Sequence, residues 1–238
     1  MTAVRAVFFD AGETILHPHP SFAELFAEVL RSRGRVVDQA RVQEVVSAYS
    51  ARFTDTVVSG EGRLWSTSPD RSRAMWRGLY EAFFQELGID GDRDGLFDAL
   101  HERFTDVSSY RLHPDALPTL DRLAGTDLTL GLISNFEEWL QRLLEVLEVR
   151  QYFDVTVISG VEGVEKPDPR IFRIALDRAG VSPEESVYVG DHPFFDVQAA
   201  REVGMVPVLI DRRGRHPQVD ALRITSLEDL PRAIGVEA

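Results

Sequence analysis

Residues 4–12 read Val4-Arg5-Ala6-Val7-Phe8-Phe9-Asp10-Ala11-Gly12, an apolar run that ends abruptly at a carboxylate. Such a near-continuous apolar run is typical of a parallel strand that is covered on both faces. Later segments of the same character predict further strands. They are Leu128 to Ile133, Val155 to Ile158, Val187 to Val189, Val206 to Ile210 and the short Arg223 to Thr225.

Helical patterns alternate with these runs. Apolar residues recur at helical spacing over residues 116–123, 139–147 and 171–179. The third pattern has Pro169 at its start and Gly180 at its end, which is the usual asymmetry of helix termini. Alternating strands and helices predict an α/β fold with an open, doubly wound parallel sheet.

The stretch between the first and second strands has a different pattern. Its apolar residues recur at helical spacing throughout, and the strongest stripe, from Met75 to Leu87, is rich in aromatic residues. We interpret this stripe as part of a hydrophobic core. We therefore expect two domains: residues 1–17 and 111–238 form the α/β catalytic core, and residues 18–110 form an inserted all-α domain.

The composition is that of a globular protein with a strongly acidic balance. The 238 residues carry a formal net charge of −13, which disfavours nucleic acid and anionic membranes as partners. Cysteine is absent, which excludes disulfides and thiolate chemistry. No apolar run approaches the roughly 20 residues of a membrane helix. The apolar start, residues 1–9, is too short for a signal peptide, so we expect a cytoplasmic protein.

An anionic substrate of so acidic a chain needs a local positive site, and Lys166 is one candidate. It is the only lysine among 26 Lys and Arg residues. Its ammonium is a compact point charge that a planar guanidinium does not replace in a tight site. We interpret Lys166 as a group that binds an anion or an ionised side chain; an exposed loop lysine is the alternative.

Polar residues mark the predicted carboxyl ends of four strands. In chain order they are Asp10, Ser134-Asn135, Lys166, and Gly190-Asp191 with Asp196 shortly after. Open α/β sheets place their ligands at this edge, so we expect these residues to form one site.

The four segments resemble, in order and context, the motifs of the haloacid dehalogenase-like hydrolase superfamily. They are Phe8-Phe9-Asp10-Ala11-Gly12-Glu13-Thr14-Ile15, Leu132-Ile133-Ser134-Asn135, Glu165-Lys166-Pro167-Asp168-Pro169-Arg170-Ile171-Phe172, and Val189-Gly190-Asp191 continuing to Asp196. The helical insert after the first motif resembles the α-helical cap of one subclass. The resemblance implies a Rossmann-like hydrolase core with an all-α cap.

The resemblance also implies roles for these residues. Asp10 would be the nucleophile that forms an aspartyl-phosphate. Asp10, Asp191 and the carbonyl of Gly12 would bind Mg²⁺. Asp196 would bind the ion through water or orient Asp191, although an acid at a helix start has the same appearance.

Two further roles concern the phosphoryl group. Ser134 and the backbone amide of Asn135 would hold its oxygens, although a serine at a strand end is also a common turn or capping residue. Lys166 would pair with Asp10 and the phosphoryl group and offset the charge that builds during transfer.

One position departs from the family's phosphatases, which carry a second Asp as general acid and base where this chain has Gly12. Such a group typically contributes about 10²–10⁴-fold to the rate. Glu13 should point away from Asp10 if the backbone stays extended. The remaining substitutes are His17, His19 and His113, near the predicted linkers, where solvated histidines are the alternative. In the insert, Arg63, Trp65, Arg71 and Arg73 are candidates for substrate contact.

Three functional hypotheses follow. The leading one is a Mg²⁺-dependent phosphatase acting on a small phosphorylated metabolite, as a monomer or homodimer. The second is a 2-haloacid dehalogenase, in which Asp10 attacks carbon, although dehalogenases usually lack the Gly-Asp metal motif that Gly190-Asp191 provides. The third, supported by Gly12 alone, is a catalytically weak relative that binds a phosphometabolite or a protein.

Overall fold

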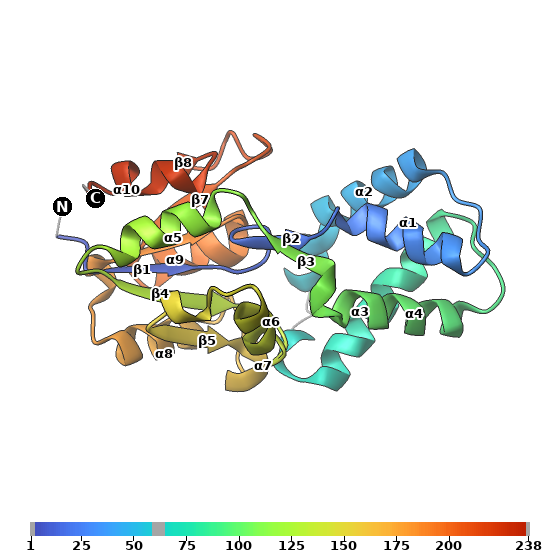
Figure 1. Cartoon of the computed structure of the whole chain (residues 1–238), viewed down its shortest axis with the longest axis horizontal. Coiled ribbons are helices and arrows are strands. Elements are labelled where there is room, and N and C mark those ends of the chain that lie inside the picture. Colours follow the sequence, from blue (N-terminus) through green and yellow to red (C-terminus); the bar gives the residue numbers. More distant parts are fainter. Residues whose placement is uncertain (1–2, 59–64, 237–238) are drawn as a thin grey trace. The chain divides into compact units, whose positions relative to one another are not determined.

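The structure is a computed structural model that describes residues 3–58 and 65–236. The chain divides into two compact units, which Figure 1 shows with its colours following the sequence. Unit 1 comprises Met1–His17 and Leu112–Ala238, and unit 2 comprises Pro18–Arg111.

Unit 1 is built on a parallel sheet in the order β5-β4-β1-β6-β7-β8. The strands are β1 (Ala6–Phe9), β4 (Thr129–Ser134), β5 (Val155–Ile158), β6 (Ser186–Gly190), β7 (Val206–Ile210) and β8 (Leu222–Ile224). The predicted doubly wound α/β fold is confirmed, and every predicted strand is present to within a residue or two.

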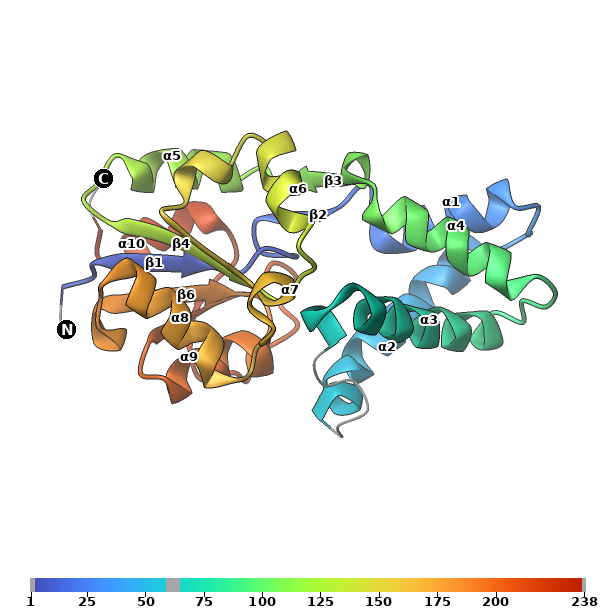
Figure 2. The ribbon, with the colours of Figure 1, turned by 90° about the horizontal axis from the view of Figure 1, so that it is seen from below.

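Helices cover both faces of this sheet, as Figure 2 shows. On one face lie α5 (Ala116–Ala124) and α6 (Leu140–Val146), and on the other lie α8 (Pro169–Ala179) and α9 (Ala199–Glu202). Shorter helices are α7 (Ser159–Glu162) and α10 (Leu230–Ala233). Because both faces are covered, the central strands need apolar side chains on both sides, which explains their continuous apolar sequence.

The termini of α8 follow from its sequence. The Asp168 side chain accepts a hydrogen bond from the backbone N–H of Arg170, and Pro169 occupies the first turn, where its missing N–H costs nothing. The helix ends at Gly180, whose φ of 64° lies in the left-handed region that glycine adopts without strain. This helix begins three residues after Lys166.

Strand β1 lies between β4 and β6, with Phe9 level with both Leu132 and Val189. The carboxyl ends of the three strands therefore reach the same edge of the sheet. This register places the residues that follow each strand next to one another.

Unit 2 is helical. It contains α1 (Phe22–Ser32), α2 (Gln39–Val58), α3 (Pro69–Glu86) and α4 (Arg93–Thr105) around an aromatic core that includes Phe26, Tyr80 and Phe83. Short strands β2 (Leu16–Pro18) and β3 (Tyr110–Leu112) pair where the connections between the units were expected. In the described part of the chain, no helix combines the length and apolar character that a membrane span requires.

Candidate active site

Asp10 lies directly after β1, at the centre of the sheet edge. Its backbone N–H donates to the carbonyl of Val189 at 2.8 Å, which continues the ladder between β1 and β6 by one residue. The residue is 7% exposed. One carboxylate oxygen from each of Asp10, Asp191 and Asp196 lies within 4.8 Å of the others. Three acids from two neighbouring strand ends thus form a compact, largely buried cluster.

Lys166 provides the positive charge of this cluster. Its Nζ lies 2.8 Å from Asp10 Oδ1 and 2.7 Å from Asp196 Oδ1, and the residue is 3% exposed. The Asn135 side chain fixes its backbone, since Oδ1 accepts from the Lys166 N–H at 2.7 Å and Nδ2 donates to the Lys166 carbonyl at 2.8 Å. The single lysine is therefore buried among carboxylates and is not an exposed loop residue.

Burial and mutual repulsion dominate the electrostatics of the acids. Burial raises the pKa of Asp10, an effect that Lys166 opposes and Asp196 reinforces. Burial also raises the pKa of Asp191 well above its usual value, with further contributions from Asp196 and Asp10. For Lys166, burial lowers the pKa, but the charges of Asp10 and Asp196 outweigh burial and leave it raised. The acid cluster carries more negative charge than one ammonium balances.

This donor set fits Mg²⁺. Three carboxylates and one ammonium leave two uncompensated negative charges when all are ionised, which one divalent cation neutralises. Carboxylate and carbonyl oxygens are the ligands that Mg²⁺ prefers. Lys166 contacts only one carboxylate oxygen of Asp10, so the other oxygen of Asp10 is left for a cation.

Asp196 is the most firmly held of the acids. It lies in a π-helical segment (Pro193–Gln198), where its Oδ1 accepts from Lys166 and its Oδ2 accepts from the His192 N–H at 2.8 Å. A Cβ at position 190 would lie 2.3 Å from the Asp196 Cγ, so this close approach requires Gly190. The contacts of both carboxylate oxygens favour an orienting role for Asp196 over direct metal binding.

Ser134 ends β4 and is 2% exposed. Its neighbour Asn135 points its side chain at the Lys166 backbone, an arrangement that the sequence did not predict. The two residues lie at the same sheet edge as Asp10, because β4 and β1 are paired in parallel register.

The turn after Asp10 differs from the expectation for Glu13. The backbone is not extended there: Glu13 has a φ of 55°, and its N–H donates to the carbonyl of Leu16 at 2.7 Å. Its carboxylate lies 4.0 Å from Arg213, and its side chain is 47% exposed. The assumption of an extended backbone at Glu13 was therefore wrong. The reason is a tight turn, in which Arg212 also donates a hydrogen bond to the carbonyl of Thr14 at 2.7 Å.

Gly12 lies in the same turn, without a positive φ. A Cβ built on it meets nothing within 4 Å. Neither the local backbone conformation nor packing therefore demands glycine at this position.

The three histidines occupy different places. His17 and His113 belong to unit 1 and stack with ring centroids 4.5 Å apart. Burial lowers the pKa of His113 to about 4, with smaller contributions from Arg212 and His17. His19 belongs to unit 2, where its N–H donates to the carbonyl of Ser109. His113 is therefore neutral at physiological pH and is not the solvated histidine of the alternative.

Tyr188 is a polar residue of this region that the sequence analysis missed. It lies in the middle of β6, between Val187 and Val189, and its hydroxyl accepts from Lys166 Nζ at 2.8 Å. Burial raises its pKa well above 10, so it is a neutral phenol. A lone tyrosine inside an otherwise aliphatic buried strand is the signal that would have marked it, because its hydroxyl requires a partner.

The predicted contacts of the insert lie within unit 2. Arg71 donates to Thr67, Arg73 pairs with Asp98 at 2.6 Å, and Trp65 stacks edge-on against Trp76. Arg63 lies outside the described residues. The substrate-binding role of Arg63, Trp65, Arg71 and Arg73 stays a prediction.

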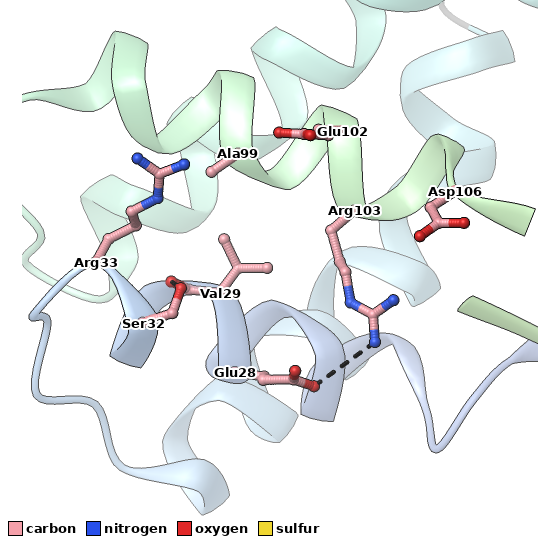
Figure 3. Close-up of a pocket in the computed structure, with 8 residues that line it drawn as sticks. All are labelled: Glu28, Val29, Ser32, Arg33, Ala99, Glu102, Arg103 and Asp106. Atoms are coloured by element: carbon pink, nitrogen blue, oxygen red, sulfur yellow. Dashed lines mark hydrogen bonds and ion pairs between the residues drawn. The ribbon is translucent and has the colours of Figure 1, made fainter. Parts of the chain in front are cut away.

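A shallow pocket of about 250 Å³ lies between α1 and α4 of unit 2 (Figure 3). Its lining residues are Glu28, Val29, Ser32, Arg33, Ala99, Glu102, Arg103 and Asp106. Arg103 and Glu28 lie 3.9 Å apart across it, as the dashed line shows. The pocket is small for a ligand site, and its charged lining consists of three acids and two arginines.

Comparison with known proteins identifies the class. The haloacid dehalogenase-like hydrolase family model matches residues 4–204. The chain is 32% identical to phosphoserine phosphatase of Thermus thermophilus, over 95% of this chain and 98% of the relative. It is 33% identical to (S)-2-haloacid dehalogenase 4A of Burkholderia cepacia, over 92% of this chain and 87% of the relative.

A structural comparison agrees. The magnesium-bound HAD-hydrolase YfnB of Bacillus subtilis has a TM-score of 0.81 over 99% of this chain and 100% of its own, at 16% identity, a likeness that concerns the fold alone. Fold and sequence together define a hydrolase with a Rossmann-like parallel sheet. The chain belongs to the haloacid dehalogenase-like hydrolase family.

Proposed function

We propose that the chain is a Mg²⁺-dependent phosphatase that hydrolyses a small phosphorylated metabolite through an aspartyl-phosphate at Asp10. The observation that carries the proposal is the setting of Asp10, which is buried, bonded through Oδ1 to Lys166 and clustered with Asp191 and Asp196. The identity to phosphoserine phosphatase supports the same class of reaction.

In the proposed reaction, Asp10 attacks phosphorus through one carboxylate oxygen and keeps the other for the cation. The bond from phosphorus to the leaving oxygen breaks, and the leaving group takes its proton from water because Gly12 has none to give. Water then attacks the same phosphorus, the bond to Asp10 breaks, and inorganic phosphate leaves with Asp10 restored. The proton that this water loses neutralises the hydroxide left when the leaving group was protonated. Without an acid at position 12, good leaving groups are favoured or turnover is slow.

The other residues stabilise charge in this scheme. Asp10, Asp191 and the carbonyl oxygen of Gly12 would hold Mg²⁺, which when bound draws the anionic phosphoryl group to the carboxylate. Ser134 and the N–H of Asn135 bind phosphoryl oxygens, and Lys166 offsets negative charge at Asp10. We assign Asp196 to orienting Lys166, since their contact is 2.7 Å.

Unit 2 corresponds, in this proposal, to the predicted cap of residues 18–110, and it selects the substrate. The acidic balance of the chain supports a small substrate in place of nucleic acid or an anionic membrane. The proposal includes a cytoplasmic setting, where phosphorylated metabolites are found.

Hydrolysis of p-nitrophenyl phosphate with and without Mg²⁺ tests this function. We expect metal-dependent activity in the native chain and its loss in Asp10→Asn. Asp177→Asn, an exposed substitution of the same kind on α8, is the matched control and retains activity. Activity without metal, or activity that survives Asp10→Asn, would refute the proposal.

A second candidate is a 2-haloacid dehalogenase, in which Asp10 attacks carbon and halide leaves. The 33% identity to a haloacid dehalogenase favours it, and so does Gly12, since halide needs no proton. The retained Asp191 argues against it. Halide release from 2-chloropropionate in the presence of a chelator would decide for this reaction.

A further inference from the structure

The ammonium group of Lys166 has three N–H donors and three acceptors around it. Two are the carboxylates of Asp10 and Asp196, at 2.8 and 2.7 Å. The third is the hydroxyl of Tyr188, at 2.8 Å. Because a lysine ammonium carries three donors and no acceptor, its bonding capacity is complete. The carboxylates are explained by the proposed chemistry, whereas the neutral phenol is not.

The Tyr188 hydroxyl also contacts a second predicted element of the site. It lies 2.9 Å from the carbonyl of Ile133, and 3.2 Å from Asp196 Oδ1. A hydroxyl has one donor and two acceptor positions, so it can donate to Ile133 while it accepts from Lys166. Ile133 directly precedes Ser134. The hydroxyl oxygen of Tyr188, a residue of β6, therefore connects the end of β4 with Lys166.

The ring that carries this hydroxyl is fixed by packing. Tyr188 is fully buried in the core between the sheet and α8, and its ring meets Phe172 edge-on with centroids 5.2 Å apart. Its backbone is paired on both sides, with Phe8 of β1 and Pro207 of β7. The hydroxyl is thus a rigid support, unlike the four-carbon stem of the lysine.

We propose that Tyr188 is a positioning residue, whose hydroxyl holds the Lys166 ammonium on Asp10 Oδ1 and at a set distance from Ser134. Without it, two carboxylates and a flexible stem determine where the ammonium lies, and it can shift toward Asp196. This inference rests on the proposed phosphatase function for its catalytic part, but the contact itself can be measured without any substrate.

The single lysine makes a direct measurement possible, because lysine labelled with ¹⁵N at Nζ gives one side-chain ammonium signal. In the native chain we expect hydrogen exchange of this ammonium to be slow. In Tyr188→Phe, which removes one oxygen and keeps the ring, we expect exchange at least about tenfold faster. Tyr110→Phe removes a comparable phenol, bonded to the carbonyl of Phe104 at 2.8 Å, and leaves the signal unchanged.

Kinetics test the catalytic part. We expect Tyr188→Phe to lower kcat for p-nitrophenyl phosphate about tenfold, with KM within about twofold of native. In the Lys166→Met background the same substitution has no further effect on the rate of the p-nitrophenolate burst, because Tyr188 acts through Lys166.

The outcomes separate the two proposals. Native exchange rates and native kcat in Tyr188→Phe would overturn the inference, and so would an equal loss in both backgrounds, which indicates a structural effect only. An ammonium signal that depends on Tyr188 in a chain without phosphatase activity would refute the proposed function and the catalytic part of the inference. The contact itself would then stand.

Discussion

At the scale of single residues, the site combines Lys166, whose three ammonium donors are all hydrogen-bonded, with Gly12, which stands where the family's phosphatases carry an acid. Lys166 has its side-chain donors on Asp10, Asp196 and Tyr188 and its backbone on Asn135, so its position is defined by four other residues. Gly12 is the opposite case, since a side chain there would meet nothing within 4 Å. We therefore expect Lys166 not to tolerate substitution and Gly12 to tolerate it.

Lys166→Arg tests the first expectation. A wide planar guanidinium does not fit where a compact ammonium contacts three oxygens at 2.7–2.8 Å, so we expect at least about a 100-fold loss of kcat/KM. Circular dichroism and a thermal melt establish that the variant is folded. A folded variant with near-native activity would show that the ammonium geometry is not required.

Gly12→Asp tests the second expectation by adding the acid that the family's phosphatases carry at this position. Because the position has open space and no positive φ, the fold should accept it. We expect kcat for an alkyl phosphate to rise by about tenfold or more, within the range that acid–base catalysis provides.

The matched control for that substitution is Gly12→Asn, which has the same shape and no acid. The dependence of rate on leaving-group pKa, measured with a series of phosphate esters, should be steep in the native chain and shallower in Gly12→Asp. Equal slopes in all three proteins would show that another group already supplies the proton.

At the scale of elements, the sheet depends on a close contact between β1 and β4. A Cβ at Gly131 would lie 2.3 Å from the Phe8 ring, so the ring of one strand occupies the side-chain position of the next. We expect Gly131→Ala to destabilise the protein by about 1–3 kcal/mol in urea unfolding. Gly78→Ala, inside α3 with no atom within 4 Å, is the control and should stabilise by about 0.5–1 kcal/mol. Equal effects would contradict this packing.

His113, which follows β3, gives a pH dependence of stability. Its pKa is about 4 in the folded chain against the usual 6.5, so the unfolded chain binds the proton more readily. Its contribution is complete above about pH 6.5 and is lost as the pH falls towards about 4. We expect the native chain to lose about 1 kcal/mol more than His113→Gln over this range, after allowance for partial exposure. Parallel urea unfolding curves at each pH measure the difference.

The sequence predicted elements well where local patterns determine them. Val155–Ile158 and Val206–Ile210 have the predicted bounds, because both are mainly apolar runs that end at a polar residue, Ser159 and Asp211 respectively. Strands β2 and β3 were not predicted, since each is only three residues long. In addition, β2 includes His17 and Pro18, which carry no strand signal.

The sequence predicted the acids, Gly12, Ser134, Asn135 and Lys166 as site residues, but not the contacts between them. The contacts that support them join distant positions: Tyr188 reaches Ile133 across 55 residues, and Asn135 reaches Lys166 across 31. No local pattern encodes such pairs, because they arise from the parallel register of β5, β4, β1 and β6. The left-handed turn at Glu13 was missed for the same reason, because Arg212, about 200 residues further along the chain, binds the carbonyls of Glu13 and Thr14.

At the scale of the whole molecule, the charge balance predicts that Mg²⁺ stabilises the fold. Burial raises the pKa of Asp10 and of Asp191, so folding with both ionised becomes less favourable as the pH rises above their usual value of 3.8. A cation that binds the ionised form removes this cost. At about 100 times its Kd, Mg²⁺ should add about 2–3 kcal/mol at neutral pH and less near pH 5.

Thermal melts with MgCl₂, and with KCl at matched ionic strength, measure this effect. Asp191→Asn should be insensitive to Mg²⁺, whereas Asp177→Asn should respond like the native chain. An equal shift with KCl would contradict a specific site and would indicate screening of the net charge of −13.

The central claim is that Asp10 accepts the phosphoryl group, and the most direct measurement is mass spectrometry of the chain quenched in acid during turnover of p-nitrophenyl phosphate with Mg²⁺. Because Gly12 leaves the second step without a base, the intermediate should accumulate. The account predicts a phosphoryl group on the peptide that contains Asp10, absent in Asp10→Asn and absent without metal. Turnover without phosphorylation of Asp10, or phosphorylation at another residue, would contradict it.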